Sequence, residues 1–387
     1  MHRLWAIAAA AAVAVALVVA PTASPSNFIR SGIFDDAQIL YGNPQVVFPA
    51  LKAAQTETIR VNLWWGGHTD DISVAPRRPA AAKDPADPAY DWTTYDRTVR
   101  YGAAYEMRVL FSILGTPGWA NGGKGWNVAP TRAADLRDFA VAAARRYNGR
   151  FIAADGRPLP RVAFWVAWNE PNNPVFLKPQ FTKVSGKWQI QSAKDYAAMC
   201  NAIVTGIRSV PGSGKVACGA TGPRGNNNPS TSRPSVSPLA FMRAMNAAGA
   251  KGFDAYDHHP YYGQRSETPT TKPPPGIHGN DPTAVTLGNF DVLVKELTRL
   301  YGYGMRVWVT EYGYQTNPPD KLVGVTWAQQ AIYLTQAYQL MQQNKRVDLF
   351  LWFLFKDEVR VGGWQSGLFT ADGRKKPAYN AFKTMHG

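Results

Sequence analysis

The sequence has 387 residues, of which 45% are hydrophobic and 18% are charged, a composition typical of a globular protein. It carries 42 Lys and Arg against 27 Asp and Glu, which gives a formal net charge of +15. The basic residues are dispersed along the chain, which excludes the concentrated basic patch or tail of most nucleic-acid-binding proteins. The excess indicates a solvated surface, with loose attraction to an anionic polysaccharide as the second interpretation.

The N-terminal stretch predicts export from the cell. Residues 4–20 form an apolar run behind the basic Arg3, and residues 21–26 are rich in Pro, Ser and Thr. This pattern is that of a secretory signal peptide, so we assign residues 1–24 to the signal and residues 27–387 to a secreted domain without stable membrane insertion. An uncleaved anchor is the alternative, because 17 apolar residues come close to the lower limit for a membrane span.

Strand and helix patterns alternate along the rest of the chain. Apolar, β-rich runs predict strands over residues 29–34, 58–65, 107–114, 162–168, 215–221, 253–261, 306–311 and 347–355. Apolar residues at helical spacing, or starts at proline, predict helices over residues 44–54, 94–104, 136–147, 192–209, 287–301, 331–341 and 377–382, with one more from residue 238. Residues 181–190 alternate around Ser185-Gly186, which predicts an inserted hairpin.

Eight strand–helix alternations predict an α/β fold, a single (β/α)8 or TIM barrel. Long loops follow the predicted strands that end near residues 65, 114, 221 and 261. All of these loops leave the carboxyl ends of strands, so we expect them to form the walls of one cleft.

The chain has two cysteines, Cys200 and Cys218. In an oxidising compartment they could pair and link a helix to the following strand. Two inert buried thiols are the alternative, because pairing needs a suitable Cα separation. Two cysteines at this spacing do not form a zinc motif.

Two glutamates follow predicted strands at equivalent positions. The apolar run Val162–Trp168 leads into Asn169-Glu170-Pro171, and the proline ends the strand because it has no N–H for a ladder. Some 140 residues on, the run from Arg306 ends in Thr310-Glu311. Catalytic groups of (β/α)8 barrels lie where strands open into loops, and two carboxylates are the minimum for hydrolysis of a glycosidic bond.

These two motifs resemble those of clan A glycoside hydrolases, especially families 5 and 39. The matching stretches are Trp168-Asn-Glu-Pro-Asn172 and Thr310-Glu-Tyr-Gly313. The resemblance implies that Glu170 is the acid/base and Glu311 the nucleophile of a retaining enzyme. Family 5 enzymes typically carry a His after the third strand, where this chain has the stretch 111–119 without one, so the resemblance leans toward family 39.

The resemblance also implies roles for other residues. Arg60, inside an apolar strand, matches the Arg that keeps the nucleophile ionised, with a sheet-end cap as the alternative. His259 and Tyr261 share a strand face and match residues that line the sugar site and contact the nucleophile, while His258 would pack against a helix. Asn169 would hold the sugar 2-hydroxyl. Trp352 matches a Trp beneath the sugar, with a core position as the alternative.

Other aromatic residues are weaker candidates for the substrate cleft. Trp119, Trp126 and Trp364 lie on predicted loops, where a large apolar ring needs a reason to be exposed. We expect a monomeric enzyme that acts on carbohydrate and needs no metal or organic cofactor. A metal-dependent barrel hydrolase and a non-catalytic carbohydrate-binding relative are the alternatives. The first would need three or more ligands at strand ends, and the second would be expected to lack one of the two glutamates.

Overall fold

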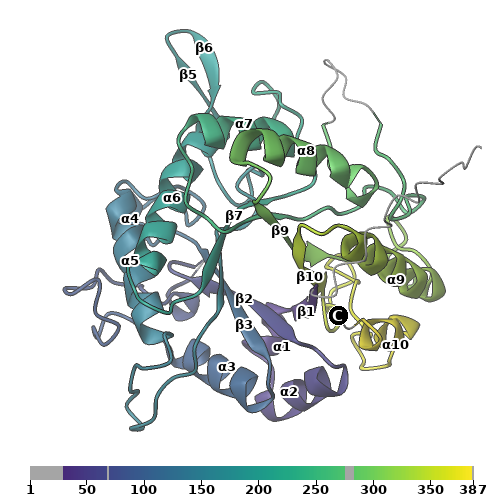
Figure 1. Ribbon diagram of the computed structural model, residues 1–387, viewed down its shortest axis with the longest axis horizontal. Helices are drawn as coiled ribbons and strands as arrows, with labels where there is room; N and C mark the ends of the chain where they lie inside the picture. Colours follow the sequence, from purple (N-terminus) through teal and green to yellow (C-terminus); the bar gives the residue numbers. More distant parts are fainter. Residues whose placement is uncertain (1–28, 68, 275–282, 386–387) are drawn as a thin grey trace, which may run out of the picture.

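The computed structural model describes residues 29–67, 69–274 and 283–385. Eight parallel strands close into a barrel in the order β1-β10-β9-β8-β7-β4-β3-β2, and β1 pairs with β2 to complete the ring (Figure 1). The strands are β1 (Arg30–Phe34), β2 (Thr58–Trp64), β3 (Arg108–Leu114), β4 (Phe164–Ala167), β7 (Lys215–Thr221), β8 (Ala255–His258), β9 (Arg306–Tyr312) and β10 (Val347–Phe353). The predicted (β/α)8 barrel is confirmed. The predicted signal peptide lies outside the described residues.

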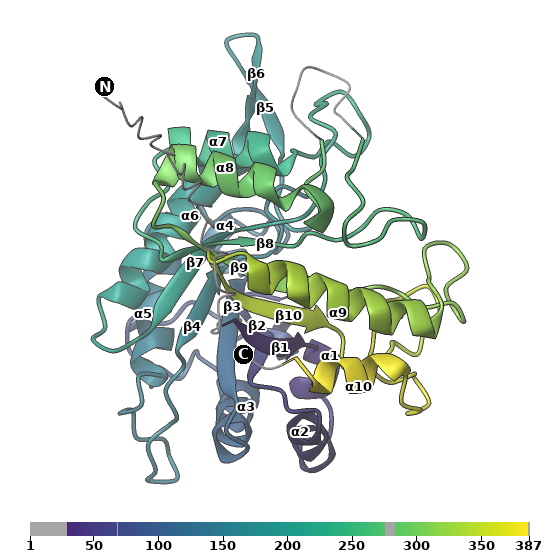
Figure 2. The same cartoon turned by 45° about the vertical axis from the view of Figure 1, so that its right-hand side comes forward.

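Helices surround the barrel on its outer face (Figure 2). They are α1 (Asp36–Ile39), α2 (Pro44–Ala53), α3 (Thr93–Ala104), α4 (Gly118–Asn121), α5 (Ala133–Arg146), α6 (Gln191–Arg208), α7 (Pro238–Ala247), α8 (Phe290–Tyr301), α9 (Trp327–Gln343) and α10 (Pro377–Lys383), with 3-10 turns at Asp70–Ile72 and Leu287–Asn289. The antiparallel hairpin of β5 (Phe181–Val184) and β6 (Lys187–Ile190) projects from the body, as predicted (Figure 1). The short helices α1 and α4 were not predicted.

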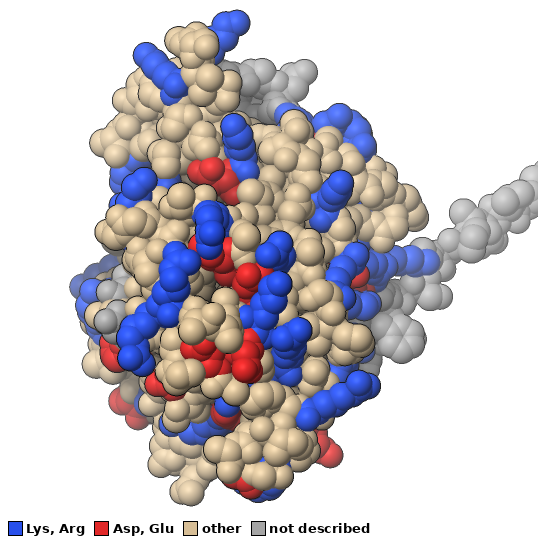
Figure 3. All heavy atoms as spheres, turned by 90° about the vertical axis from the view of Figure 1, so that its left-hand side faces the viewer, with Lys and Arg blue, Asp and Glu red and all other residues tan. Residues whose placement is uncertain are grey.

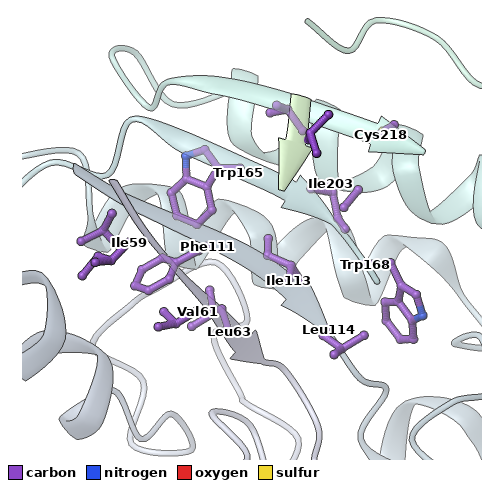
Figure 4. Packing of buried hydrophobic residues seen from close by; sticks show 14 of the residues in the cluster. Ile59, Val61, Leu63, Phe111, Ile113, Leu114, Trp165, Trp168, Ile203 and Cys218 are labelled. Atoms are coloured by element: carbon purple, nitrogen blue, oxygen red, sulfur yellow. The ribbon is translucent and has the colours of Figure 1, made fainter. Parts of the chain in front are cut away.

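Alternation along the strands separates two layers of core. Ile59, Val61 and Leu63 of β2 belong to the large cluster between strands and helices (Figure 4), whereas Arg60 and Asn62 on the same strand point the other way, into the barrel. The barrel interior is filled by a second cluster that includes Leu110, Phe164, Val166, Trp308, Leu349 and Leu351. A residue's parity along its strand therefore decides whether it can reach the barrel mouth.

Two further features bear on the sequence predictions. Cys200 of α6 and Cys218 of β7 form a disulfide, with their Cα atoms 6.0 Å apart, which settles the two alternatives for these residues. On the face seen in Figure 3, Lys and Arg are scattered among acidic and uncharged residues. Within the described residues, every helix is too short or too polar to span a bilayer.

Candidate active site

A cavity of about 880 Å³ opens at the carboxyl ends of the barrel strands. Glu170 follows β4, Glu311 is the penultimate residue of β9, and both line this cavity. One carboxylate oxygen of each lies within 4.8 Å of the other. The structure thus brings together the two glutamates that the sequence placed about 140 residues apart.

The backbone around Glu170 is unusual. Trp168 (φ 71°) and Glu170 (φ 37°) both have positive φ, a conformation that costs most side chains energy and that clusters at functional sites. The Glu170 N–H donates to the Ala220 carbonyl at 2.7 Å, which ties the residue to the end of β7. Gly222 lies against the carboxylate, since a Cβ built there would come within 2.8 Å of the Glu170 Cδ. A side chain at position 222 would therefore displace Glu170.

A bulge in β9 turns Glu311 into the barrel. Phe350 and Trp352 of β10 pair with Val309 and Tyr312, so β9 has one extra residue between these partners. In a regular strand, Thr310 and Glu311 would point to opposite faces, whereas both here bind the same arginine.

Arg60 connects the two motifs from beneath the cavity. Its fully buried guanidinium donates from Nη1 to Glu311 Oε1 at 2.9 Å and from Nη2 to Asn169 Oδ1 at 2.6 Å, while Nε donates to Ser112 Oγ at 2.8 Å. The ring of Phe34 lies 4.3 Å from the guanidinium carbon. Because the Asn169 oxygen is bound to Arg60, the amide N–H groups of Asn169 are left as donors. Arg60 is thus an ion partner of Glu311 and not a sheet-end cap.

His259 lies between the two glutamates. Its Nδ1 is 3.2 Å from Glu170 Oε1 and 3.6 Å from Glu311 Oε1. Its Nε2 is 3.2 Å from Thr310 Oγ1, whose hydroxyl donates to Asp257 Oδ2 at 2.6 Å and can therefore only accept from the imidazole. Nδ1 faces carboxylate oxygens, whereas Nε2 faces both the accepting Thr310 hydroxyl and Arg60 Nη1, a donor 3.3 Å away. Burial by itself lowers the pKa of His259, but the charge of Glu311 and the contacts with Asp257 and Glu170 raise it to about 9.

Asp257 is a site residue that the sequence analysis missed. Its carboxylate is fully buried, 3.6 Å from His259 Nε2, and it accepts from the Thr310 N–H and hydroxyl. Burial raises its pKa, but the contact with His259 and the positive charges of His259 and Arg60 together hold the pKa of Asp257 below its usual range. The signal was its position in the predicted strand, two residues before His259 and thus on the same face.

Glu311 is held by more partners than Glu170. The Tyr261 hydroxyl donates to Glu311 Oε2 at 3.2 Å, so each oxygen of this carboxylate has its own donor. Burial raises the pKa of Glu311, against the lowering effect of the charges of His259 and Arg60. His258, on the opposite strand face, binds the Val285 carbonyl and packs near Phe290, as predicted.

The structure corrects the predicted position of Trp352. The side chain is fully buried, and its indole N–H donates to the Ser366 carbonyl at 2.8 Å. Because Leu349 and Leu351 of β10 face the barrel interior, Trp352 faces the helices and cannot lie beneath a sugar. A one-residue difference in parity separates it from Phe353, which does line the cavity.

The loop tryptophans take different positions. Trp119 does not line the cavity; it packs edge-on against Trp65, and its N–H donates to the Ala75 carbonyl. Trp126 packs against Phe176, a cavity residue, without lining the cavity itself. Trp364 does line it, with its ring 5.3 Å from that of Tyr261. Trp364 is therefore the tryptophan placed to contact a ligand.

Fold and site together define a class, a (β/α)8 barrel with paired glutamates at the ends of its fourth and seventh barrel strands. The chain belongs to the family described as "Family of unknown function (DUF5722)", whose model matches residues 127–387. No curated protein matches the chain.

Solved glycoside hydrolases share the fold. A family 39 glycoside hydrolase from Bacteroides cellulosilyticus WH2 superposes with a TM-score of 0.64 and 19% identity, covering 93% of this chain and 64% of that one. A GH39 β-xylosidase from Caulobacter crescentus gives a TM-score of 0.57 at 15% identity, covering 94% and 72%. The GH53 catalytic domain of Ignisphaera aggregans gives a TM-score of 0.57 at 15% identity, covering 96% and 100%. This chain thus spans less than two thirds of the length of the Bacteroides protein. At these identities the likeness establishes the fold.

Proposed function

We propose that this protein is an exported, retaining glycoside hydrolase that cleaves O-glycosidic bonds of a polysaccharide or oligosaccharide. The observation that carries the proposal is the asymmetric glutamate pair, because Arg60 and Tyr261 hold only Glu311 while Glu170 faces it across the cavity. One oxygen of each carboxylate lies within 4.8 Å of the other, which fits the closer spacing of retaining enzymes, about 5–5.5 Å between carboxyl groups, better than the about 6.5–9.5 Å of inverting ones.

In the first step Glu311 attacks the anomeric carbon while Glu170 gives its proton to the departing oxygen, so that the glycosidic bond breaks as the ester bond to Glu311 forms. The side-chain N–H groups of Asn169, which donate to none of the described residues, would bind the sugar hydroxyl next to the reacting carbon. In the second step Glu170 takes a proton from water, and the resulting hydroxide displaces Glu311 with the starting configuration restored.

Export is part of the proposal and has separate support. The apolar stretch of residues 4–20 has the pattern of a signal peptide, and disulfides such as Cys200–Cys218 persist mainly in oxidising compartments. Expression of the full chain in a secreting host, with N-terminal sequencing of protein from the medium, tests this. A start near residue 25 supports export, and retention of residues 1–24 contradicts it.

A metal-dependent hydrolase is the second candidate, because Glu170, His259 and Glu311 offer ligand atoms within 4.8 Å of one another. The positive charges of Arg60 and His259 already balance the carboxylates there, which disfavours a divalent cation.

A panel of 2,4-dinitrophenyl glycosides tests the function, with the anomeric configuration of the first product followed by NMR. We expect release of dinitrophenol with retention, unchanged by EDTA, and none from the Glu170→Gln, Glu311→Gln double variant. Loss of activity with EDTA supports the metal enzyme. Binding of oligosaccharides without turnover supports the non-catalytic relative.

A further inference from the structure

Two neighbouring aspartates follow β1 at the edge of the cavity, and they differ in how fully they are bound. Asp35 caps α1 by accepting from the Gln38 N–H, and its other oxygen accepts from the N–H groups of Phe355 and Lys356. Asp35 is 1% exposed, and three backbone donors account for its burial. Its role is to join the β1 and β10 loops.

Asp36 has a different environment. Its Oδ1 accepts from the Asn62 backbone N–H at 3.0 Å, and its Oδ2 accepts from Asn62 Nδ2 at 2.9 Å. One residue thus holds both oxygens. Among the described residues Asp36 forms no ion pair, and it lines the same cavity as Glu170 and Glu311. A carboxylate has about four acceptor positions, so about two are left toward the cavity.

The contact with Asp36 leaves the side-chain oxygen of Asn62 without a hydrogen-bond donor among the described residues. Asn62 is 8% exposed, and its buried Oδ1 accepts no hydrogen bond from the described residues, an arrangement that is unfavourable for a buried acceptor. Asn62 lies two residues after Arg60 on β2, so both point into the barrel, with Asn62 nearer the mouth. The amide thus holds Asp36 beside the catalytic pair and leaves one acceptor without a donor.

We infer that Asp36 binds neighbouring hydroxyl groups of the sugar unit seated at Glu170 and Glu311, with Asn62 as its positioning residue. This inference rests on the proposed function. A sugar ring supplies pairs of O–H donors, and a carboxylate accepts two at once through charge-assisted hydrogen bonds. Arg60, the cation that acts on Asp36, is bound to Glu311, Asn169 and Ser112. At Asp36 itself the sugar unit is therefore recognised by its hydroxyl donors.

The test compares wild type with Asp36→Asn on the aryl glycoside that wild type hydrolyses best and on its 3-deoxy and 4-deoxy analogues. We expect Asp36→Asn to lower kcat/KM on the parent by about 10- to 100-fold, the effect of losing hydrogen bonds to a charged group. With the wild-type enzyme, kcat/KM for at least one deoxy analogue should be lower than for the parent by a similar factor. With Asp36→Asn, the same analogue and the parent should have nearly equal kcat/KM. Comparing the deoxy-to-parent ratio between the two enzymes cancels the intrinsic reactivity of each substrate.

Two further variants define the roles. Asn62→Ala should raise KM and show the same deoxy pattern as Asp36→Asn, which a merely structural residue would not do. Asp291→Asn, at an exposed position in the first turn of α8, is the control for loss of one carboxylate and should match wild type.

The inference is overturned if folded Asp36→Asn keeps the wild-type kcat/KM, or if the deoxy analogues lose the same factor in variant and wild type. If Asp36→Asn does not fold, the wild-type deoxy series decides, and analogues within about twofold of the parent contradict the inference, because a lost hydrogen bond to a charged group exceeds that factor. Absence of any wild-type turnover on the panel overturns the proposed function first and this inference with it.

Discussion

The two glutamates of the cavity are of one residue type but lie in different environments. Glu311 is 7% exposed, sits in a strand, and has Arg60 on one oxygen and Tyr261 on the other. Glu170 sits in a loop with positive φ, and the hydrogen-bond partners of its oxygens among the described residues are Asn173 Nδ2 and His259 Nδ1, both at 3.2 Å. A fixed carboxylate beside a permanent cation suits a nucleophile, whereas a less constrained one suits a group that gains and loses a proton. In the proposed function, the two roles therefore follow from the environment of each glutamate and not from the residue type.

Replacing Glu311 should have the largest effect. Glu311→Gln removes the group that forms the covalent bond, so we expect at least ~10³-fold loss of kcat on substrates with good and poor leaving groups alike. Loss of a general acid or base costs a similar ~10²–10⁴-fold, but the size of that loss depends on the leaving group. Glu170→Gln should lose activity mainly on poor leaving groups in the first step. Comparison of dinitrophenyl and methyl glycosides measures this. If the two variants depended on the leaving group in the same way, the proposed difference in role between Glu311 and Glu170 would be contradicted.

Changing Arg60 tests the positive charge that distinguishes the environment of Glu311 from that of Glu170. His259 and Arg60 both lower the pKa of Glu311, and Arg60→Met removes the second of these cations, so the pKa rises. The acidic limb of the kcat/KM profile then moves to higher pH, since activity is lost as falling pH protonates Glu311. We expect a loss on the order of 10²-fold near neutral pH, as for other electrostatic contacts. Arg60→Lys, which keeps the charge, is the control and should move the limb less. An unmoved limb in folded Arg60→Met would make Arg60 a structural residue.

A substitution at Gly222 tests the role of Glu170, whose carboxylate lies against this glycine. The Cβ of Gly222→Ala would come within 2.8 Å of the Glu170 carboxyl carbon, and the flexible end of Glu170 can move aside. We expect a roughly 10-fold loss on poor leaving groups and almost none on dinitrophenyl glycosides, because small displacements of a catalytic group are costly. Gly304→Ala, with open space at its Cβ, is the matched control. Equal losses on both substrate types would show that Glu170 is not the acid.

The smallest expected effect concerns Trp364, which lies next to Tyr261 on the Glu311 side. Trp364→Ala removes an aromatic face from the cavity wall and should raise KM about 2- to 10-fold with kcat nearly unchanged, in line with the modest strength of single ring contacts. Trp188→Ala, on the projecting hairpin and 47% exposed, should leave both constants unchanged. A matching change in Trp188→Ala would remove Trp364 from the binding site.

Sequence patterns predicted the barrel and much of the site, because both depend on local signals. Buried runs marked the eight strands, and each glutamate followed such a run. The spacing of His259 and Tyr261 indicated that both belong to the site; they follow the end of β8 at His258, and both contact Glu311. Arg60 stood out as a charge within an apolar strand.

What the sequence could not show depends on three-dimensional register. In β10 both faces are apolar, so nothing local indicates that Phe353 rather than Trp352 faces the cavity. The bulge that turns Glu311 inward depends on pairing with β10 and has no signal within β9. Asp36 was missed because its partner Asn62 lies on another strand.

The most direct test of the asymmetry is azide rescue of Glu170→Ala. With a dinitrophenyl glycoside this variant should form the glycosyl-enzyme on Glu311 and stall, because no base activates water. Added azide should then restart turnover and give a glycosyl azide with the configuration of the substrate, measured by NMR. A glycosyl azide of inverted configuration from Glu170→Ala would mean that the two roles are exchanged and would contradict the account.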